Sequence, residues 1–215
     1  GAGIARGLRG GLARWLLHYL RMWDVRTASG VDAFIANSHF IAGRIRKAYN
    51  RASTVIYPPV DTTRFALHEG KEDYYLAASR MVPYKRMDLI VRAFAALPDR
   101  RLIVVGDGPC YRRVRREGPS NVTFRGALGQ DELVETMQRA RALVFAALED
   151  FGMVPVEAMA CGTPVIAYGR GGTAETVIPG RTGVHFDRQD PQSIADAIRR
   201  FERAGHRLER IRSAE

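Results

Sequence analysis

The sequence predicts an α/β protein with a doubly wound parallel sheet, and three observations lead to this fold class. From residue 73 onward, short apolar runs of strand length alternate with segments of helical periodicity. Glycine-rich turns follow several of these runs, at 106–109, 126 and 169–172. The run that Pro164 opens is apolar at every position, as in a parallel strand covered by helices on both faces.

Six strands are expected in this rhythm, at 74–78, 101–105, 122–124, 142–145, 164–167 and 183–186. The helices are expected at 87–97, 111–116, 130–140, 154–160, 173–177 and 191–203. Because doubly wound sheets bind ligands at the carboxyl ends of their strands, the glycine turns are expected to share one rim of the sheet.

The chain before residue 73 predicts a second, incomplete domain. A strand at 33–36, a helix at 39–49 capped by Ser38 and a strand at 54–56 precede Pro58 and Pro59, which stiffen the chain. We therefore interpret 1–57 as the tail of an amino-terminal domain, 58–72 as an interdomain linker, 73–204 as the ligand-binding domain and 205–215 as a C-terminal tail.

Composition excludes several classes of protein. The 215 residues are 46% hydrophobic and 26% charged, as in ordinary globular domains, and no apolar run reaches the length of a membrane span. Two cysteines cannot form a disulfide framework, which favours a reducing, cytoplasmic location. The net charge is +10, but no nucleic-acid recognition motif accompanies it, so no nucleic-acid partner is expected.

Part of the positive charge lies near the amino terminus. Arginines at 6, 9, 14, 21 and 26 alternate with leucines and tryptophans, which is typical of a basic amphipathic helix. Such a helix can lie on an anionic membrane surface, here the inner face as a peripheral contact. The other interpretation is a surface helix of the amino-terminal domain.

The segment 149–157 has the pattern of a ligand cradle. Glu149 precedes Phe151, Gly152 and Met153, whose backbone N–H groups are expected at a helix N-terminus, where anions bind. Glu157 lies further into that helix and could accept hydrogen bonds from a ribose diol. A nucleotide sugar fits this set of groups. Two unrelated solvated carboxylates are the simpler alternative, and a glycosidase pair is disfavoured because eight helical residues span about 12 Å, beyond the roughly 5–9.5 Å required.

This segment resembles the E-x7-E signature of the retaining glycosyltransferases of family 4, which have the GT-B fold. In that family the first glutamate contacts the donor sugar and the second the ribose, which implies these roles for Glu149 and Glu157. The loop after the first strand of the ligand-binding domain carries Arg80 and Lys85, and the resemblance implies that they hold the donor diphosphate. Two cations there would stabilise the leaving diphosphate without a metal.

Other turns are assigned more weakly by the same resemblance. Gly106 and Gly108 follow a strand near the ligand face, and Arg125 and Gly126 are candidates to border the nucleotide base. Val154 joins the donor-binding segment at the start of its helix. The turn 169–175 is expected near the donor, with Glu175 in a structural role.

The resemblance implies a Rossmann-like donor-binding half of a glycosyltransferase that moves a hexose to an acceptor hydroxyl with retention of configuration. The residues at 36–38 and 57–61 are similar to those of mannosyltransferases of surface-polysaccharide biosynthesis, which favours GDP-mannose as the donor. UDP- and ADP-sugars stay open as alternative donors. No metal or cofactor is expected. The acceptor would be a saccharide or a lipid-linked saccharide, and a missing amino-terminal domain would supply its pocket, so the isolated chain is expected to be inactive.

Three other interpretations stay open at this point. The chain could be a nucleotide-sugar binding module without transferase activity, a GT-B epimerase, or a basic nucleic-acid-binding domain. The epimerase should lack the E-x7-E cradle. None of the five histidines matches a catalytic position or a metal-ligand spacing, so none is assigned a role.

Overall fold

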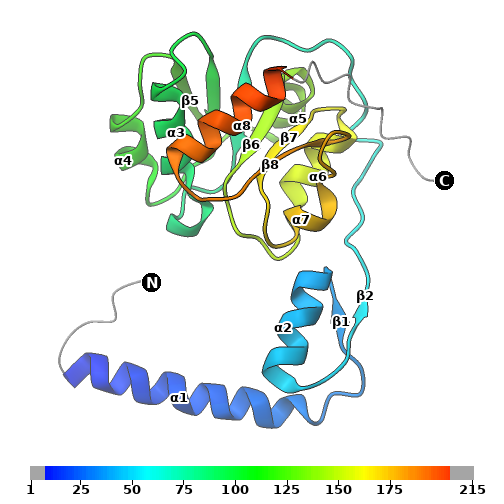
Figure 1. Ribbon diagram of the computed structural model, residues 1–215. Helices are drawn as coiled ribbons and strands as arrows, with labels where there is room; N and C mark the ends of the chain where they lie inside the picture. The colour runs from blue at the N-terminus through cyan, green and yellow to red at the C-terminus, as the bar shows by residue number, and fades with distance from the viewer. Residues whose placement is uncertain (1–7, 204–215) are drawn as a thin grey trace. The chain divides into compact units, whose positions relative to one another are not determined.

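A computed structural model describes residues 8–203, and the chain divides between Tyr57 and Pro58 into two compact units (Figure 1). The first unit contains helices α1 and α2 with a two-stranded sheet, and the second contains a six-stranded sheet with its helices. The tail expected at 205–215 lies outside the described residues.

The first unit buries little of its surface. It consists of α1 (Leu8–Ala28), α2 (His39–Tyr49) and a parallel pair formed by β1 (Ile35–Ala36) and β2 (Thr54–Val55). The Ser38 hydroxyl oxygen accepts a hydrogen bond from the Ile41 N–H at 3.1 Å and caps α2, as the sequence predicts. Helix α2 nevertheless contains no buried residue. Because burial of apolar area is the main source of stability, this unit has little of its own.

Helix α1 exposes apolar side chains along its length. Six of them follow the i, i+3, i+4 spacing of one helix face and are 45–67% exposed: Leu12, Trp15, Leu16, Tyr19, Leu20 and Trp23. Leu17 and Val25 are also exposed and interrupt the opposite face, which carries Arg14 and Arg21. The helix is therefore less strictly amphipathic than the sequence pattern indicates. Among residues 8–203, no helix combines the length and the apolar character needed to cross a bilayer.

The second unit confirms the predicted doubly wound parallel sheet. Its strands are ordered β5-β4-β3-β6-β7-β8 and all pair in parallel. Their bounds are β3 (Tyr75–Ala78), β4 (Leu102–Val105), β5 (Val122–Gly126), β6 (Ala142–Phe145), β7 (Val165–Tyr168) and β8 (Gly183–Phe186). The chain winds outward from β3 to β5, returns to place β6 against the free side of β3, and winds outward again to β8. The loops that follow β3 and β6 therefore leave their strands in opposite directions, which creates a switch point.

Helices cover both faces of this sheet. One face packs against α3 (Met87–Ala95), α4 (Tyr111–Arg116) and α8 (Pro191–Arg203), and the other against α5 (Gln130–Arg139) and α6 (Met153–Ala160). Figure 1 shows α8 lying across the sheet on the same side as α3. The short helix α7 (Thr173–Thr176) contacts α6 and β7.

Strand β3 shows why the strands are apolar at every position. Tyr75 and Ala77 enter the core under α3 and α8, whereas Leu76 and Ala78 enter the core under α5 and α6. All four are buried. Successive side chains of a strand point to opposite faces, so a sheet with two covered faces requires an unbroken apolar run.

The segment 58–72 has no regular secondary structure but is fastened to the second unit. The Lys71 ammonium donates hydrogen bonds to the carbonyls of Gln138 (2.6 Å) and Cys161 (3.1 Å) and to the Thr163 hydroxyl (2.8 Å). Burial lowers the pKa of Lys71 to about 8. The His68 N–H also donates to the Cys161 carbonyl at 3.2 Å. These contacts fix the segment against the ends of α5 and α6.

Most observed elements lie within one or two residues of the sequence prediction. Helix α3 ends at Ala95 rather than 97, because Leu97 precedes Pro98 and a residue before proline disfavours helical geometry. Strand β5 continues to Gly126, beyond the expected end at 124, because a register shift between Val104 and Val105 lets Val105 pair with Gly126.

We predict that Gly106→Ala destabilises the second unit by about 1–3 kcal/mol, the range for a strained backbone position. Gly106 has φ +128°, and a Cβ there would lie 1.9 Å from the Ser79 carbonyl oxygen. Gly129→Ala is the matched control, because a Cβ at Gly129 meets nothing within 4 Å and its φ is −62°. Urea unfolding of both variants measures the difference. Equal free energies of unfolding in the two variants would contradict the close approach of the loop that follows β4, at Gly106, to the loop that follows β3, at Ser79.

Candidate functional site

The loops that follow β3, β4 and β5 are joined by backbone hydrogen bonds. The Ser79 N–H donates to the Val105 carbonyl at 3.1 Å and the Met81 N–H to the Asp107 carbonyl at 2.9 Å. The Gly106 N–H donates to the Gly126 carbonyl at 2.7 Å. These bonds hold the loop that carries Arg80 and Lys85 in one position at the carboxyl edge of the sheet.

The loops that follow β6 and β7 form a second pair. The Gly172 N–H donates to the Glu149 carbonyl at 2.9 Å. A Cβ at Gly172 would lie 2.3 Å from the Phe151 Cα, so only glycine allows the two backbones to approach this closely. Phe151 is buried in this contact. The backbone around Glu149 is therefore as firmly held as that of the loops across the switch point.

An ion pair bridges the two sets of loops. The Lys85 Nζ lies 2.5 Å from the Glu149 Oε1, and the two side chains are only 16% and 20% exposed. Lys85 ends the short 3₁₀ helix η1 (Pro83–Lys85) after β3, and Glu149 lies in the loop after β6. Two residues assigned separately, one to a diphosphate and one to a sugar, therefore touch each other directly at the switch point.

Aromatic rings lie close to this pair. The Lys85 Nζ is 5.3 Å from the centroid of the Tyr84 ring and 6.0 Å from that of Phe145. Both distances are within the range of a cation–π attraction. The Lys85 side chain is only 16% exposed, and this limited access of water strengthens the attraction of its ammonium to anions.

Helix α6 begins beside this pair, as expected. Gly152 caps the helix with φ +91°, and no side chain caps the first turn. The backbone N–H groups of Met153 and Val154 can therefore point at a ligand anion, whereas Pro155, the third residue of the helix, has no N–H to offer. Met153 is exposed and Val154 is half-buried.

Glu157 lies one turn into α6 and is half-buried. Burial raises the pKa of its carboxyl above the usual value. Residues 149–152 form a loop, so the seven residues between the two glutamates are only partly helical. A single loop-to-helix junction thus presents a carboxylate, a row of amides and a second carboxylate.

Arg80 is exposed, and its side chain has no hydrogen bond or ion pair among the described residues. Its position between Ser79 and Met81 is nevertheless fixed by the backbone bonds to the loop after β4. Arg80 is therefore available to a ligand without breaking an internal contact.

Gly108 and Gly126 line a cavity of about 480 Å³ at the same edge of the sheet. Its other lining residues are Asp107, Pro109, Tyr111 and Arg112, of which Asp107, Tyr111 and Arg112 were not anticipated. The signal for the last two was present, because α4 begins directly after the turn that follows β4, and its first residues must face the same edge.

Arg125 points elsewhere. Its guanidinium forms a salt bridge with Glu132 of α5, with Nη2 2.5 Å from Oε1, and lies 3.5 Å from the Thr136 hydroxyl. Its side chain thus lies on the α5 face of the sheet, while Phe124 packs against the core under α4. The structure does not bring the Arg125 guanidinium into contact with the residues that line the Gly108 cavity.

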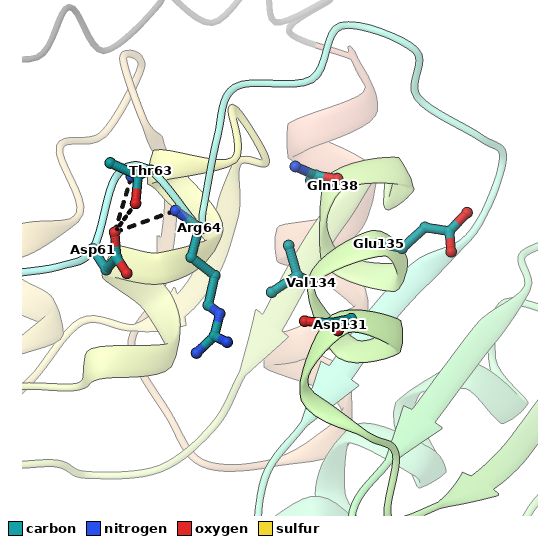
Figure 2. A pocket seen from close by; sticks show the side chains of 7 residues that line it. All are labelled: Asp61, Thr63, Arg64, Asp131, Val134, Glu135 and Gln138. Atoms are coloured by element: carbon teal, nitrogen blue, oxygen red, sulfur yellow. Dashed lines mark hydrogen bonds between the residues drawn. The ribbon is translucent and has the colours of Figure 1, made fainter.

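A larger cavity, of about 630 Å³, lies along the outer side of α5 (Figure 2). Asp61, Thr63 and Arg64 form one wall, and the α5 side chains Asp131, Val134, Glu135 and Gln138 form the other. Figure 2 shows the Asp61 carboxylate bound within its own turn, to Thr63 and to the Arg64 N–H. None of the predicted site residues lines this cavity.

Metal-binding groups are absent from the part of the chain that the structure describes. No three His, Cys, Asp or Glu side chains there converge as metal ligands. His185 contacts the Thr173 carbonyl oxygen at 3.2 Å through Nε2, a contact that belongs to the turn after β7.

Known proteins resemble this chain over most of its length. A family model described as glycosyl transferases group 1 matches residues 60–215. A GDP-mannose-dependent alpha-(1-6)-phosphatidylinositol monomannoside mannosyltransferase of Mycolicibacterium smegmatis is 31% identical over 206 residues, which cover 80% of this chain and 53% of that protein. An uncharacterized glycosyltransferase of Methanocaldococcus jannaschii is 30% identical over 172 residues, 78% of this chain and 48% of that protein.

Solved structures agree with the fold. Sucrose-phosphate synthase from Thermosynechococcus elongatus superposes with a TM-score of 0.76 at 28% identity, over 85% of this chain and 52% of that one. The Anabaena protein HepE, solved in complex with UDP-glucose, gives a TM-score of 0.71 at 24% identity over 85% and 58% of the two chains, a likeness of fold alone. The chain spans about half the length of the curated relatives it matches. By its sequence and its parallel α/β fold, this chain belongs to the glycosyl transferases group 1 family.

Proposed function

We propose that this chain is the donor-binding half of a retaining glycosyltransferase, which transfers a hexose from a nucleoside-diphosphate sugar to an acceptor hydroxyl. The observation that carries the proposal is the contact of Lys85 with Glu149 at the switch point, beside the uncapped first turn of α6. A cation, a carboxylate and free amides are the groups that a pyrophosphate-linked sugar requires. In this proposal the donor-binding domain spans residues 73–204, and residues 1–57 belong to the acceptor-side domain.

Each group has a distinct role in this proposal. Arg80 and Lys85 bind the diphosphate and stabilise the negative charge that grows on it as the sugar leaves. Glu149 accepts hydrogen bonds from sugar hydroxyls and orients the hexose. The acceptor hydroxyl attacks the anomeric carbon from the face that the diphosphate leaves, and its proton passes to the departing diphosphate oxygen, so the anomeric configuration is retained. The catalytic groups on this chain are then Arg80, Lys85 and Glu149, and no metal is required.

The remaining groups bind the nucleotide. Amides of Phe151, Gly152, Met153 and Val154 face the donor, and Glu157 holds the ribose diol. Gly106, Gly108 and Gly126 belong to the donor side, and Gly108 and Gly126 line the cavity that follows β4 and β5, where the base would lie. Arg125 contributes less directly, because its guanidinium is held by Glu132.

GDP-mannose is the favoured donor. Two considerations support it: the similarity of the sequence to mannosyltransferases, and the name of the Mycolicibacterium smegmatis relative, a GDP-mannose-dependent mannosyltransferase. UDP- and ADP-sugars are the alternatives. That relative also acts on a lipid acceptor by its name, in keeping with a saccharide or lipid-linked acceptor here, in surface-polysaccharide biosynthesis at the cytoplasmic side of a membrane.

The first unit needs a partner in this proposal. Two paired strands are marginally stable alone, α2 buries no residue and α1 exposes a continuous apolar face. Further strands of an acceptor-side domain would cover these surfaces. The exposed tryptophans and the arginines of α1 also fit a peripheral contact with an anionic membrane. Without an acceptor pocket, residues 1–215 alone would bind donor and transfer no sugar.

We predict that the chain binds one of GDP, UDP and ADP, and that Lys85→Ala weakens this binding by about 1.5–3 kcal/mol, the contribution of a charge-assisted hydrogen bond. Lys47→Ala is the control, because Lys47 is exposed on α2 and the substitution removes the same charge. Calorimetric titration measures both. Equal affinities in the two variants would remove Lys85 from the binding site.

We further predict that nucleoside diphosphate binding depends on pH through Glu157. The ribose diol donates to the ionised carboxylate, and burial raises the pKa of this group, so protonation on acidification removes the acceptor at a higher pH than for an exposed glutamate. Between pH 7 and 4.5 the affinity should therefore fall more steeply for the unaltered chain than for Glu157→Gln. Titration of the ligand phosphates is common to both proteins and cancels. Parallel pH profiles would exclude Glu157 from ribose binding.

A further inference from the structure

The Lys85–Glu149 pair has a consequence for which ligands the site accepts, and this consequence rests on the proposed function. The Lys85 ammonium is paired with the Glu149 carboxylate, whose Oε1 lies 2.5 Å from Nζ. Both residues sit on fixed backbone: the Lys85 N–H donates to the Val82 carbonyl at 3.1 Å, and the Glu149 carbonyl accepts from Gly172 at 2.9 Å. The pair is thus built into two anchored loops rather than formed by two flexible surface side chains.

A diphosphate that binds Lys85 must compete with Glu149. The Glu149 Oε1 is buried, and the Lys85 ammonium is its single contact with a polar group among the described residues. If a phosphate draws the ammonium away, this oxygen loses its counter-ion and faces a polyanion. An unpaired buried charge is costly, so the free diphosphate binds against a penalty.

A nucleotide sugar removes that penalty. Its hexose is bonded to the diphosphate, and its hydroxyls are hydrogen-bond donors that a carboxylate can accept. Glu149 can then exchange the ammonium for sugar hydroxyls while Lys85 turns to the phosphates. After the hexose has left, the diphosphate alone remains beside an unpaired Glu149.

We propose that Glu149 acts as an internal competitor for Lys85, so that the site favours the intact nucleotide sugar over the nucleoside diphosphate. The carboxylate has opposite effects on the two ligands: it attracts the sugar and repels the bare diphosphate. The same competition promotes release of the diphosphate once transfer is complete. Glu149 is thereby a specificity-determining residue as well as one that orients the sugar.

The test is Glu149→Gln, with affinities measured by calorimetric titration for GDP and GDP-mannose, and for the UDP- and ADP-based pairs. The amide keeps the shape of the side chain but removes its charge. Binding of the nucleoside diphosphate should tighten about 3-fold or more, while binding of the nucleotide sugar should weaken about 10-fold or more, a factor that corresponds to about 1.4 kcal/mol. Opposite directions are the signature, because loss of fold weakens both ligands together.

Glu135→Gln is the matched control. Glu135 pairs with Arg139 on the outside of α5 and is 62% exposed, so its substitution changes the net charge equally without touching the site. Both affinities should stay unchanged. If Glu149→Gln does not fold, Glu149→Asp provides the second variant: its shorter side chain lengthens the contact with Lys85 and should shift the ratio of affinities in the same direction by a smaller factor.

The outcomes separate this inference from the proposed function. If the unaltered chain binds neither nucleoside diphosphates nor nucleotide sugars, both are overturned. If it binds them and Glu149→Gln changes both affinities in the same direction, or neither, only the competition by Glu149 is overturned. Opposite changes of the two affinities in Glu149→Gln, with no change of either in Glu135→Gln, support it.

Discussion

The reversal of winding direction between β3 and β6 determines where this chain can hold a ligand. Because the two strands are neighbours and their connections leave in opposite directions, the space above their carboxyl ends is not filled by a crossing loop. Lys85 enters that space from one side and Glu149 from the other. Every other feature of the site is arranged around this contact.

The surrounding loops are stiffened by glycine and by backbone hydrogen bonds. Gly106 and Gly172 let neighbouring loops approach at distances that a side chain would forbid. A binding site that must discriminate between similar anions benefits from such rigidity, since less conformational entropy is lost on binding. Arg80, by contrast, is exposed and has no hydrogen bond or ion pair among the described residues, so under the proposed function its guanidinium is available to the donor diphosphate.

Much of the second unit was predictable from sequence because both faces of its sheet are covered. The unbroken apolar runs, the glycine turns and the helical spacing identified each strand of the parallel sheet, and the E-x7-E pattern identified the family. The register shift at Val104 and the extra length of β5 were not predictable, because they depend on pairing with a neighbouring strand. Val105 pairs with Gly126 rather than with Arg125 only in the assembled sheet.

The sequence predicted a set of candidate residues but not their geometry. Spacing along the chain placed Lys85 and Glu149 on one rim, yet their direct contact depends on the strand order, which the sequence does not state. For Arg125, in contrast, position along the chain was misleading. Side chains alternate between the two faces along β5, so the Arg125 side chain lies on the α5 face, where it forms a salt bridge with Glu132. The first unit could be predicted only as separate elements, because it has few buried residues to fix how they pack.

The most direct measurement is a crystal structure of the chain with the nucleoside diphosphate that it binds most tightly. The diphosphate should lie over the carboxyl ends of β3 and β6, with its oxygens within hydrogen-bond distance of Lys85 and of the first amides of α6, and with the Lys85–Glu149 contact lengthened. A diphosphate found elsewhere, such as the cavity along the outer side of α5, with the Lys85–Glu149 pair intact at 2.5 Å, would contradict the assignment of the site.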